Sequence, residues 1–168
     1  MEKFILEPLK GIGKVSFGCN REEVREIMGM PSIEHEIIDY YFDGALRFDY
    51  SENNILEFIE ADNNDDFEVE IYGVDPFKIK AKEFKDLLTE MNTDGVVNEN
   101  NAPFSYAFNN ISVAIYRDAT EQDILISIEE AKQDRTYEED KEWLAEELEK
   151  YSHFQTIGIG RKDMYVAD

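Results

Sequence analysis

The stretch that decides the fold is "YYFDGALRFDY", residues 40–50. Aromatic and aliphatic side chains lie on both sides of Asp43-Gly44, a dipeptide that favours a tight turn because both residues tolerate left-handed backbone conformations. A further apolar run follows the turn residues Asn53-Asn54. This pattern indicates an antiparallel meander, with strands predicted at 33–38, 39–42, 45–50 and 54–61.

The residues before the meander predict a helix, "NREEVREIMG", at 20–29. Asn20 is a suitable N-cap, Glu23 completes a capping box three residues later, and Gly29 followed by Pro31 ends the helix. A similar order of elements returns further along the chain. It consists of a strand at 67–72 with alternating apolar and acidic residues, a helix at 80–91, and strands at 104–108, 111–117 and 123–129.

The two halves of the chain, 14–62 and 69–131, resemble each other in this order of elements. Either the chain contains an internal duplication, or two helix-plus-hairpin units share their patterning without common origin. Phe42, Asp43, Leu46 and Phe48 match Phe108, Asn109, Ile111 and Val113, and Ile55, Leu56, Ile59 and Glu60 match Ile124, Leu125, Ile128 and Glu129.

The C-terminal part, 136–168, predicts a further helix at 136–151 and then a closing hairpin or edge strand from "FQTIGIG" and "MYV". No linker rich in Pro, Gly or Ser divides the chain, so residues 1–168 are expected to form a single domain. The predicted fold class is α+β. We expect an antiparallel sheet from two related strand-helix-meander units, with helices on one face and the extra C-terminal helix across an edge.

The charge of the chain restricts its partners. Asp and Glu number 39 against 17 Lys and Arg, which gives a formal net charge of −22. Nucleic acid and anionic membranes are not expected partners, because their phosphates repel such a surface. Basic proteins and cations remain as candidate partners. The lone Cys19 and the lack of a signal-peptide pattern predict a cytoplasmic protein, and no apolar run is long enough to span a membrane.

The acidic stretch "EADNNDDFEVE", residues 60–70, raises the question of a cation site. Asp62, Asn64 and Asp66 occupy the first, third and fifth positions of a calcium loop. Phe67 stands where that loop requires Gly, and Gly73 stands where it requires a bidentate Glu. No metal site is therefore predicted, and the stretch is interpreted as a turn leading into a strand with one acidic face.

Signals for catalysis are weak. Cys19, His35 and His153 form no recognisable metal or nucleophile motif, and the glycine-containing segments at 11–18 and 158–163 match no phosphate-binding loop. Carboxylate pairs are too abundant for any one pair to be specific. No catalytic residue and no cofactor are predicted, and a hydrolase with paired carboxylates remains a lesser alternative.

The segment "FGCNREEVREIMGMPS" resembles the helix-opening motif of BamE-like lipoproteins and of beta-lactamase-inhibitory-protein-like modules. Phe17, Gly18, Glu23, Val24, Gly29 and Pro31 carry this resemblance, which implies a helix packed on a sheet. As a whole, this small acidic chain without catalytic motifs is similar to bacterial toxin-immunity proteins. That similarity implies a tight 1:1 complex with a cognate toxin, in many cases a basic nuclease.

The resulting functional prediction is a non-enzymatic immunity protein that neutralises a basic, nuclease-type toxin through an acidic surface. The alternatives are an acidic cytoplasmic protein with another binding role, a calcium-modulated module and the hydrolase. The oligomeric state stays open. Expected contact residues are Asp62, Asp65, Asp66, Glu68 and Glu70, with the helix at 138–149 as second choice and Tyr40, Tyr41 and Tyr72 as aromatic anchors.

Overall fold

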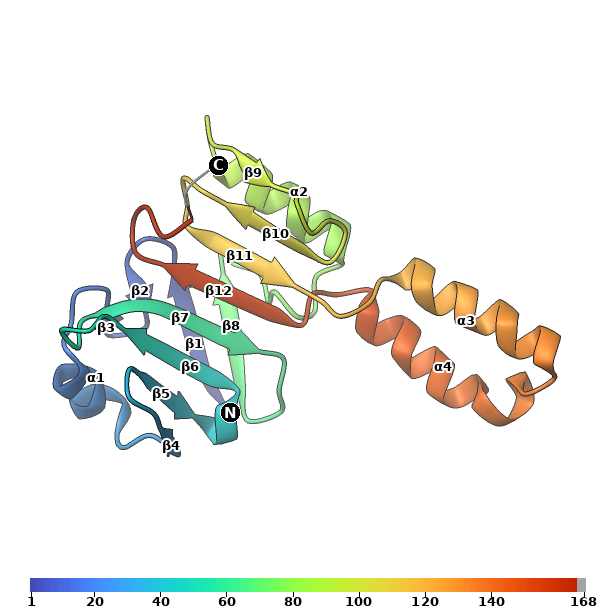
Figure 1. The fold of residues 1–168 in the computed structure, drawn as a ribbon, viewed down its shortest axis with the longest axis horizontal. Coiled ribbons are helices and arrows are strands. Elements are labelled where there is room, and N and C mark those ends of the chain that lie inside the picture. Colours follow the sequence, from blue (N-terminus) through green and yellow to red (C-terminus); the bar gives the residue numbers. More distant parts are fainter. Residues whose placement is uncertain (166–168) are drawn as a thin grey trace.

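In the computed structural model, which describes residues 1–165, the chain forms two β-sheets with helices on and beside them (Figure 1). This confirms the α+β fold class. The smaller sheet has the order β3-β2-β1-β8 and comprises β1 (Glu2–Glu7), β2 (Gly11–Ile12), β3 (Val15–Ser16) and β8 (Phe67–Ile71). The larger sheet has the order β4-β5-β6-β7-β12-β11-β10-β9 and comprises β4 (Ile33–Glu34), β5 (Ile38–Tyr41), β6 (Leu46–Tyr50), β7 (Leu56–Asp62), β9 (Val97–Asn98), β10 (Ser105–Phe108), β11 (Val113–Tyr116) and β12 (Thr156–Gly160).

The larger sheet is antiparallel throughout and consists of two four-stranded halves. Strands β4 to β7 form one half in chain order, and β12 to β9 continue the sheet in reverse order. The predicted meander is confirmed. Its Asp43-Gly44 turn is a short 3-10 helix, η1 (Phe42–Gly44), in which Asp43 adopts a left-handed conformation with φ 53°.

The strand predicted at 123–129 is wrong, because these residues lie in helix α3 (Glu121–Asp134). Thr120 caps this helix: its side chain accepts from the Asp123 amide while the Asp123 carboxylate accepts from the Thr120 amide. The strand that completes the second half of the sheet is β12, which lies at its centre and not at an edge. Residues 164–165 form a bend, and the expected strand there extends to position 166, outside the described residues.

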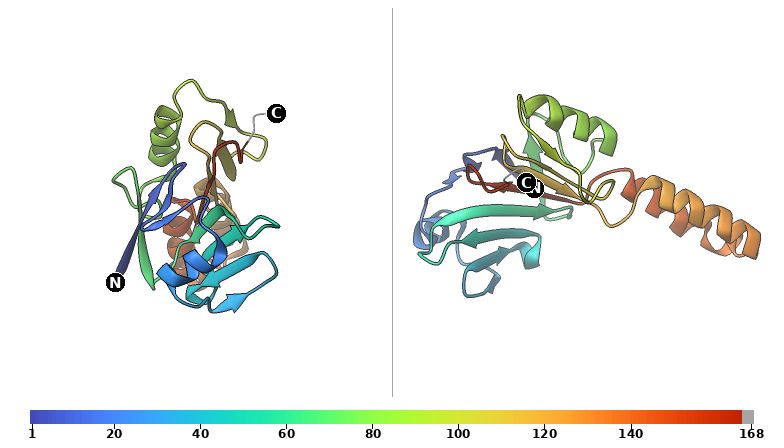
Figure 2. Two further views of the ribbon diagram at one scale, coloured as in Figure 1. Left: turned by 90° about the vertical axis from the view of Figure 1, so that its left-hand side faces the viewer. Right: turned by 45° about the horizontal axis from the view of Figure 1, so that its top comes forward.

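Helices α1 (Arg21–Met28) and α2 (Ala81–Met91) pack on the same face of the larger sheet. Arg21 and Arg25 of α1 bind Asp39 of β5, and Lys85 of α2 lies over the ring of Tyr106 of β10. That face carries a row of buried side chains across the strands, formed by Phe48, Ile59, Ile159, Val113 and Phe108. We call the opposite face, which no helix covers in the described part of the chain, the open face (Figure 2).

The smaller sheet joins the same core. β1, which the sequence analysis did not anticipate, runs parallel to β8 with Phe4 beside Val69. Phe4 contacts the ring of Phe42 at 5.9 Å between centroids, and Phe67 contacts it at 4.8 Å. Aromatic side chains thus connect the two sheets into one hydrophobic core.

Helix α4 (Tyr137–Tyr151) was expected across an edge of the sheet, but it pairs with α3 in a helical hairpin that projects from the body (Figures 1 and 2). We call residues 121–151 the arm. Ile124 and Leu144 are its buried contacts within the hairpin, and Tyr151 is buried at its base. Within residues 1–165, none of the helices is both long and apolar enough to cross a membrane.

Candidate binding surfaces

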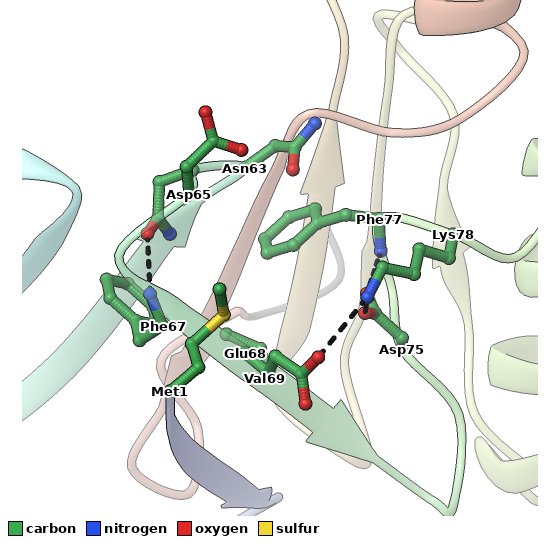
Figure 3. Close-up of a pocket in the computed structure, with 10 residues that line it drawn as sticks. Met1, Asn63, Asp65, Phe67, Glu68, Val69, Asp75, Phe77 and Lys78 are labelled. Atoms are coloured by element: carbon green, nitrogen blue, oxygen red, sulfur yellow. Dashed lines mark hydrogen bonds and ion pairs between the residues drawn. The ribbon is translucent and has the colours of Figure 1, made fainter.

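The acidic stretch 60–70 forms the end of β7, a turn and β8 (Figure 3). The side chain of Asn64 organises the turn: its Oδ1 accepts from the amides of Asp66 at 2.8 Å and Phe67 at 3.0 Å, while its Nδ2 donates to the Asp62 carbonyl at 2.8 Å. Both polar atoms of the Asn64 side chain are thus engaged in hydrogen bonds to the backbone. The described residues contain no group of three or more His, Cys, Asp or Glu side chains placed to hold a metal ion.

The predicted carboxylates of this stretch lie on different surfaces. Asp62 lies on the open face, where it accepts a hydrogen bond of 2.5 Å from the Thr156 hydroxyl. Asp66 is exposed in the turn, and Asp65 lines a pocket beside it. Glu70 of β8 forms an ion pair with Lys3 of β1, which raises the pKa of that lysine.

The pocket beside the turn has a volume of about 170 Å³ and lies between the turn, β8 and the segment before α2 (Figure 3). Lys78 crosses its rim and pairs with Asp75 at 3.1 Å and with Glu68 at 3.5 Å. These contacts, with Asp75 as the largest contributor, raise the pKa of Lys78. Two carboxylates at the pocket are therefore already neutralised by the protein's own lysine.

The three predicted aromatic anchors do not converge either. Tyr41 is only 5% exposed, because it faces the core and its hydroxyl donates to the Gly29 carbonyl at 3.0 Å. Burial raises the pKa of Tyr41 to about 12. Tyr40, its neighbour on the strand, points to the open face, and Tyr72 is half-buried beyond the end of β8. Tyr41 is thus a core residue, which removes it from any docking surface.

The open face combines charged, aromatic and very small side chains. Arg47 bonds to Asp49 at 2.6 Å and approaches Glu60 at 3.9 Å. Burial raises the pKa of Glu60, an effect that Arg47 opposes and that Asp62 reinforces. A Cβ atom at Gly158 would lie only 2.6 Å from the ring of Phe58, so this ring rests directly on the backbone of β12.

The arm carries the densest acidic charge of the chain. Twelve Asp or Glu residues lie between positions 121 and 151, against four Lys or Arg. Lys132 pairs with Glu129 and Lys141 pairs with Glu138, each within one helix. Within the described residues 1–165, eight acidic residues of the arm have no ion-pair partner: Glu121, Asp123, Glu130, Asp134, Glu139, Asp140, Glu142 and Glu146.

Large apolar side chains are exposed among these carboxylates. Trp143 is 57% exposed, and Leu125 and Ile126 are 44% and 49% exposed. All three lie outside the stripes that pack α3 against α4. The arm therefore presents more apolar surface than its own folding requires, which is typical of an interaction surface.

The base of the arm is fixed to α2 by a polar network. Lys80 bonds to the Ser152 hydroxyl at 2.7 Å and to the Glu149 carboxylate at 3.3 Å. His153 contacts the Ile79 carbonyl through Nδ1 at 2.8 Å and Glu149 through Nε2 at 3.0 Å. Both neighbours are oxygen acceptors, so a ring nitrogen that carries a proton donates to the oxygen beside it. Hydrogen bonds from His153 and then Lys80 lower the pKa of Glu149.

Sequence reasoning missed α3 and therefore the arm as a unit. The signal was present in Thr120 and Asp123, a capping box that marks a helix start more specifically than the following Ile-Leu-Ile run marks a strand. Comparison with known proteins gives no matching family model, no matching curated protein and no matching solved structure. The function is therefore inferred from the charge, burial and exposure of the surfaces described above.

Proposed function

We propose that this chain is a non-enzymatic inhibitor of the immunity type, which binds a basic, nuclease-type toxin domain and neutralises it. The observation that supports this most directly is the arm, with its eight carboxylates that lack a cationic partner in the described residues. A partner rich in Lys and Arg supplies the missing cations in charge-assisted hydrogen bonds. Such a partner also relieves the self-repulsion of a chain with net charge −22.

Inhibition follows from what a nuclease cleft must bind. Such a cleft attracts phosphates through Lys and Arg, and the two helices of the arm present carboxylates along about 20 Å. The arm projects from the body, so it can enter a concave basic site that a flat sheet face cannot reach (Figure 2). Occupation of the cleft excludes the nucleic acid, and the charge of the inhibitor accelerates encounter by ~10- to 1000-fold.

The test uses the basic C-terminal domain of a secreted protein encoded next to this chain, purified separately. Calorimetry is performed between about 50 and 300 mM NaCl, together with a nuclease assay. The expected result is a 1:1 complex that suppresses nucleic acid cleavage and weakens steeply with salt. The proposal is overturned if no such basic domain is encoded next to this chain and the chain also inhibits none of a panel of basic nucleases.

Hydrolysis by paired carboxylates is a second candidate, favoured by one observation on the open face. Burial raises the pKa of Glu60, and Asp62 lies two positions away on the same face of β7. A carboxyl group with a raised pKa beside a second carboxyl group is an arrangement that acid–base hydrolysis uses. Turnover of chromogenic glycosides or esters that disappears in Glu60→Gln would favour this candidate over inhibition.

A further inference from the structure

We infer that the outer side of α4, centred on Trp143, is the docking surface for the partner, and that it receives an arginine or lysine side chain over the indole ring. We call Trp143 with Glu139, Asp140, Glu146 and Glu147 the Trp143 surface. This inference rests on the proposed function for the basic character of the partner. It goes further by naming the anchor and the group that it binds.

The first argument is the exposure of Trp143. Its side chain is 57% exposed on the middle of a helix, while the residue that follows it, Leu144, is 2% exposed and packs inside the hairpin. The helix therefore does not need the indole for its own packing. Tryptophan is among the residues that most often dominate binding energy at protein interfaces.

The second argument is the set of residues around the indole. Side chains three and four positions away on a helix are its surface neighbours, and at Trp143 all four of these positions are acidic. Glu147 approaches Lys150 at 3.7 Å, whereas Glu139, Asp140 and Glu146 have no ion-pair partner in the described residues. The aromatic face attracts cations, and the surrounding carboxylates attract the same charge.

The third argument is a comparison within the arm. Lys132 lies over the ring of Tyr137 at 5.4 Å, and Lys150 lies over the ring of Tyr151 at 4.7 Å. Trp143 is the strongest cation-binding aromatic type, and no cation of the described residues lies over its ring. Lysines of the arm itself supply the two tyrosines with cations, one from α3 and one from α4, and the tryptophan is left for a partner.

The negative charge of the Trp143 surface determines which kind of partner it binds. A second copy of the chain brings the same excess of carboxylates, and nucleic acid brings phosphates, so both are repelled. An uncharged apolar segment would desolvate the four carboxylates without pairing them. A basic protein surface satisfies the indole and the carboxylates together, and arginine does so best because its planar guanidinium stacks and pairs at once.

Trp143 is the single tryptophan of the chain, so its fluorescence reports directly on this surface. One probe is a peptide of about six arginines, with an equally long Gly-Ser peptide as the neutral control. We expect a saturable change of Trp143 emission with the arginine peptide only. The double variant Glu139→Gln/Glu146→Gln should weaken that titration several-fold, and the matched variant Glu22→Gln/Glu52→Gln, away from the arm, should not.

The second probe is the basic toxin domain of the proposed function. Trp143→Ala should weaken its binding by about 30-fold or more, and the control variant Met30→Ala, at a position that is 73% exposed outside the arm, by no more than about twofold. Circular dichroism and thermal melts of both variants check that the arm remains folded. A toxin domain that binds Trp143→Ala as tightly as the parent chain overturns this inference and leaves the proposed function intact.

If no basic protein binds, the proposed function is wrong. Titration with the arginine peptide then still tests whether the Trp143 surface binds a cationic side chain. Unchanged emission with that peptide overturns the inference. A saturable change that Glu139→Gln/Glu146→Gln weakens supports it without the toxin.

Discussion

Ile59 on β7 lies directly opposite Ile159 on β12, at the line where the two halves of the larger sheet meet. The two side chains are 1% and 0% exposed. One belongs to the first meander, and the other comes from the last strand of the described residues, beyond the arm. The joining of the two halves into one sheet therefore depends on a contact between residues that are far apart in the sequence.

Ile159→Ala should lower the free energy of unfolding by about 2–5 kcal/mol, because the truncation leaves a cavity at a fully buried position of the core. The matched variant Ile126→Ala, at a position that is 49% exposed on the arm, should stay within about 0.5 kcal/mol. Urea unfolding followed by circular dichroism measures both. Equal effects of the two variants would contradict the central position of β12.

Asp39 anchors α1 to the sheet. Its carboxylate is 0% exposed and accepts hydrogen bonds from Arg21 Nη2 at 2.6 Å and from Arg25 Nη2 at 2.7 Å. Asp39→Ala removes the buried counterion of both arginines and leaves them, among the described residues, only the exposed Glu34, 2.9 Å from Arg25, so it should cost about 3–5 kcal/mol. Chemical denaturation provides the measurement, with exposed Glu52→Gln as the control that should change little.

The same carboxylate predicts a pH dependence of stability. Burial alone would raise the pKa of Asp39, but hydrogen bonds from Arg25 and Arg21 outweigh it and lower the pKa below the ordinary 3.8. The stabilising contribution is therefore complete above about pH 3.8 and is lost as the pH falls through the lower folded-state pKa. In this acidic range the melting temperature should fall more steeply with decreasing pH for the parent chain than for Asp39→Asn. Parallel pH profiles of the two proteins would show that protonation of Asp39 does not cause the loss of stability.

The arm should be removable without loss of the sheet, because α3 and α4 contact mainly each other, and Tyr116 and Thr156 are already paired across β11 and β12. Replacement of residues 121–149 by a flexible linker of about six residues should leave a cooperative unfolding transition and the circular dichroism of the strands. Binding of the basic toxin domain should be lost. A variant that lacks cooperative unfolding would show that the arm is part of the core.

The attachment of the arm should respond to pH through Glu149. Its pKa is lowered by His153 and Lys80, so these contacts are complete above about 4.5 and weaken as the pH falls through the lower folded-state value. Glu149→Gln should therefore speed hydrogen exchange of the Ser152 and His153 amides at neutral pH. Glu146→Gln, which removes a charge elsewhere on the same helix, should leave that exchange unchanged. Similar exchange in both variants would exclude Glu149 as the anchor.

The local elements could be predicted because neighbouring residues determine them. The Asp43-Gly44 turn and the Asn20–Glu23 capping box depend on backbone preferences and hydrogen bonds within three residues. The alternation of apolar and acidic residues at 67–71 likewise indicated a strand with one polar face, and β8 has this form. The composition alone determined that the surface is strongly acidic.

The candidate site could be predicted only in part. The helix at 138–149 was a second choice, and the preferred carboxylates of 62–70 prove to be divided between the open face, a turn and pairs with Lys3 and Lys78. Nothing within that stretch indicates these lysines, since both approach from other segments of the chain. Ion pairing with distant segments therefore determined which acidic residues of this stretch are neutralised.

Tertiary structure alone decided the rest. Successive residues of a strand face opposite sides, so the position of β5 in the sheet placed Tyr41 in the core and Tyr40 on the open face. The central place of β12 depends on its pairing with β7 and β11, which the local pattern of Gly and Ile does not encode. The sequence by itself determined helix caps, turns and net charge through short-range forces. Long-range strand pairing and burial decided which of its charges and aromatic rings remain exposed at the surface.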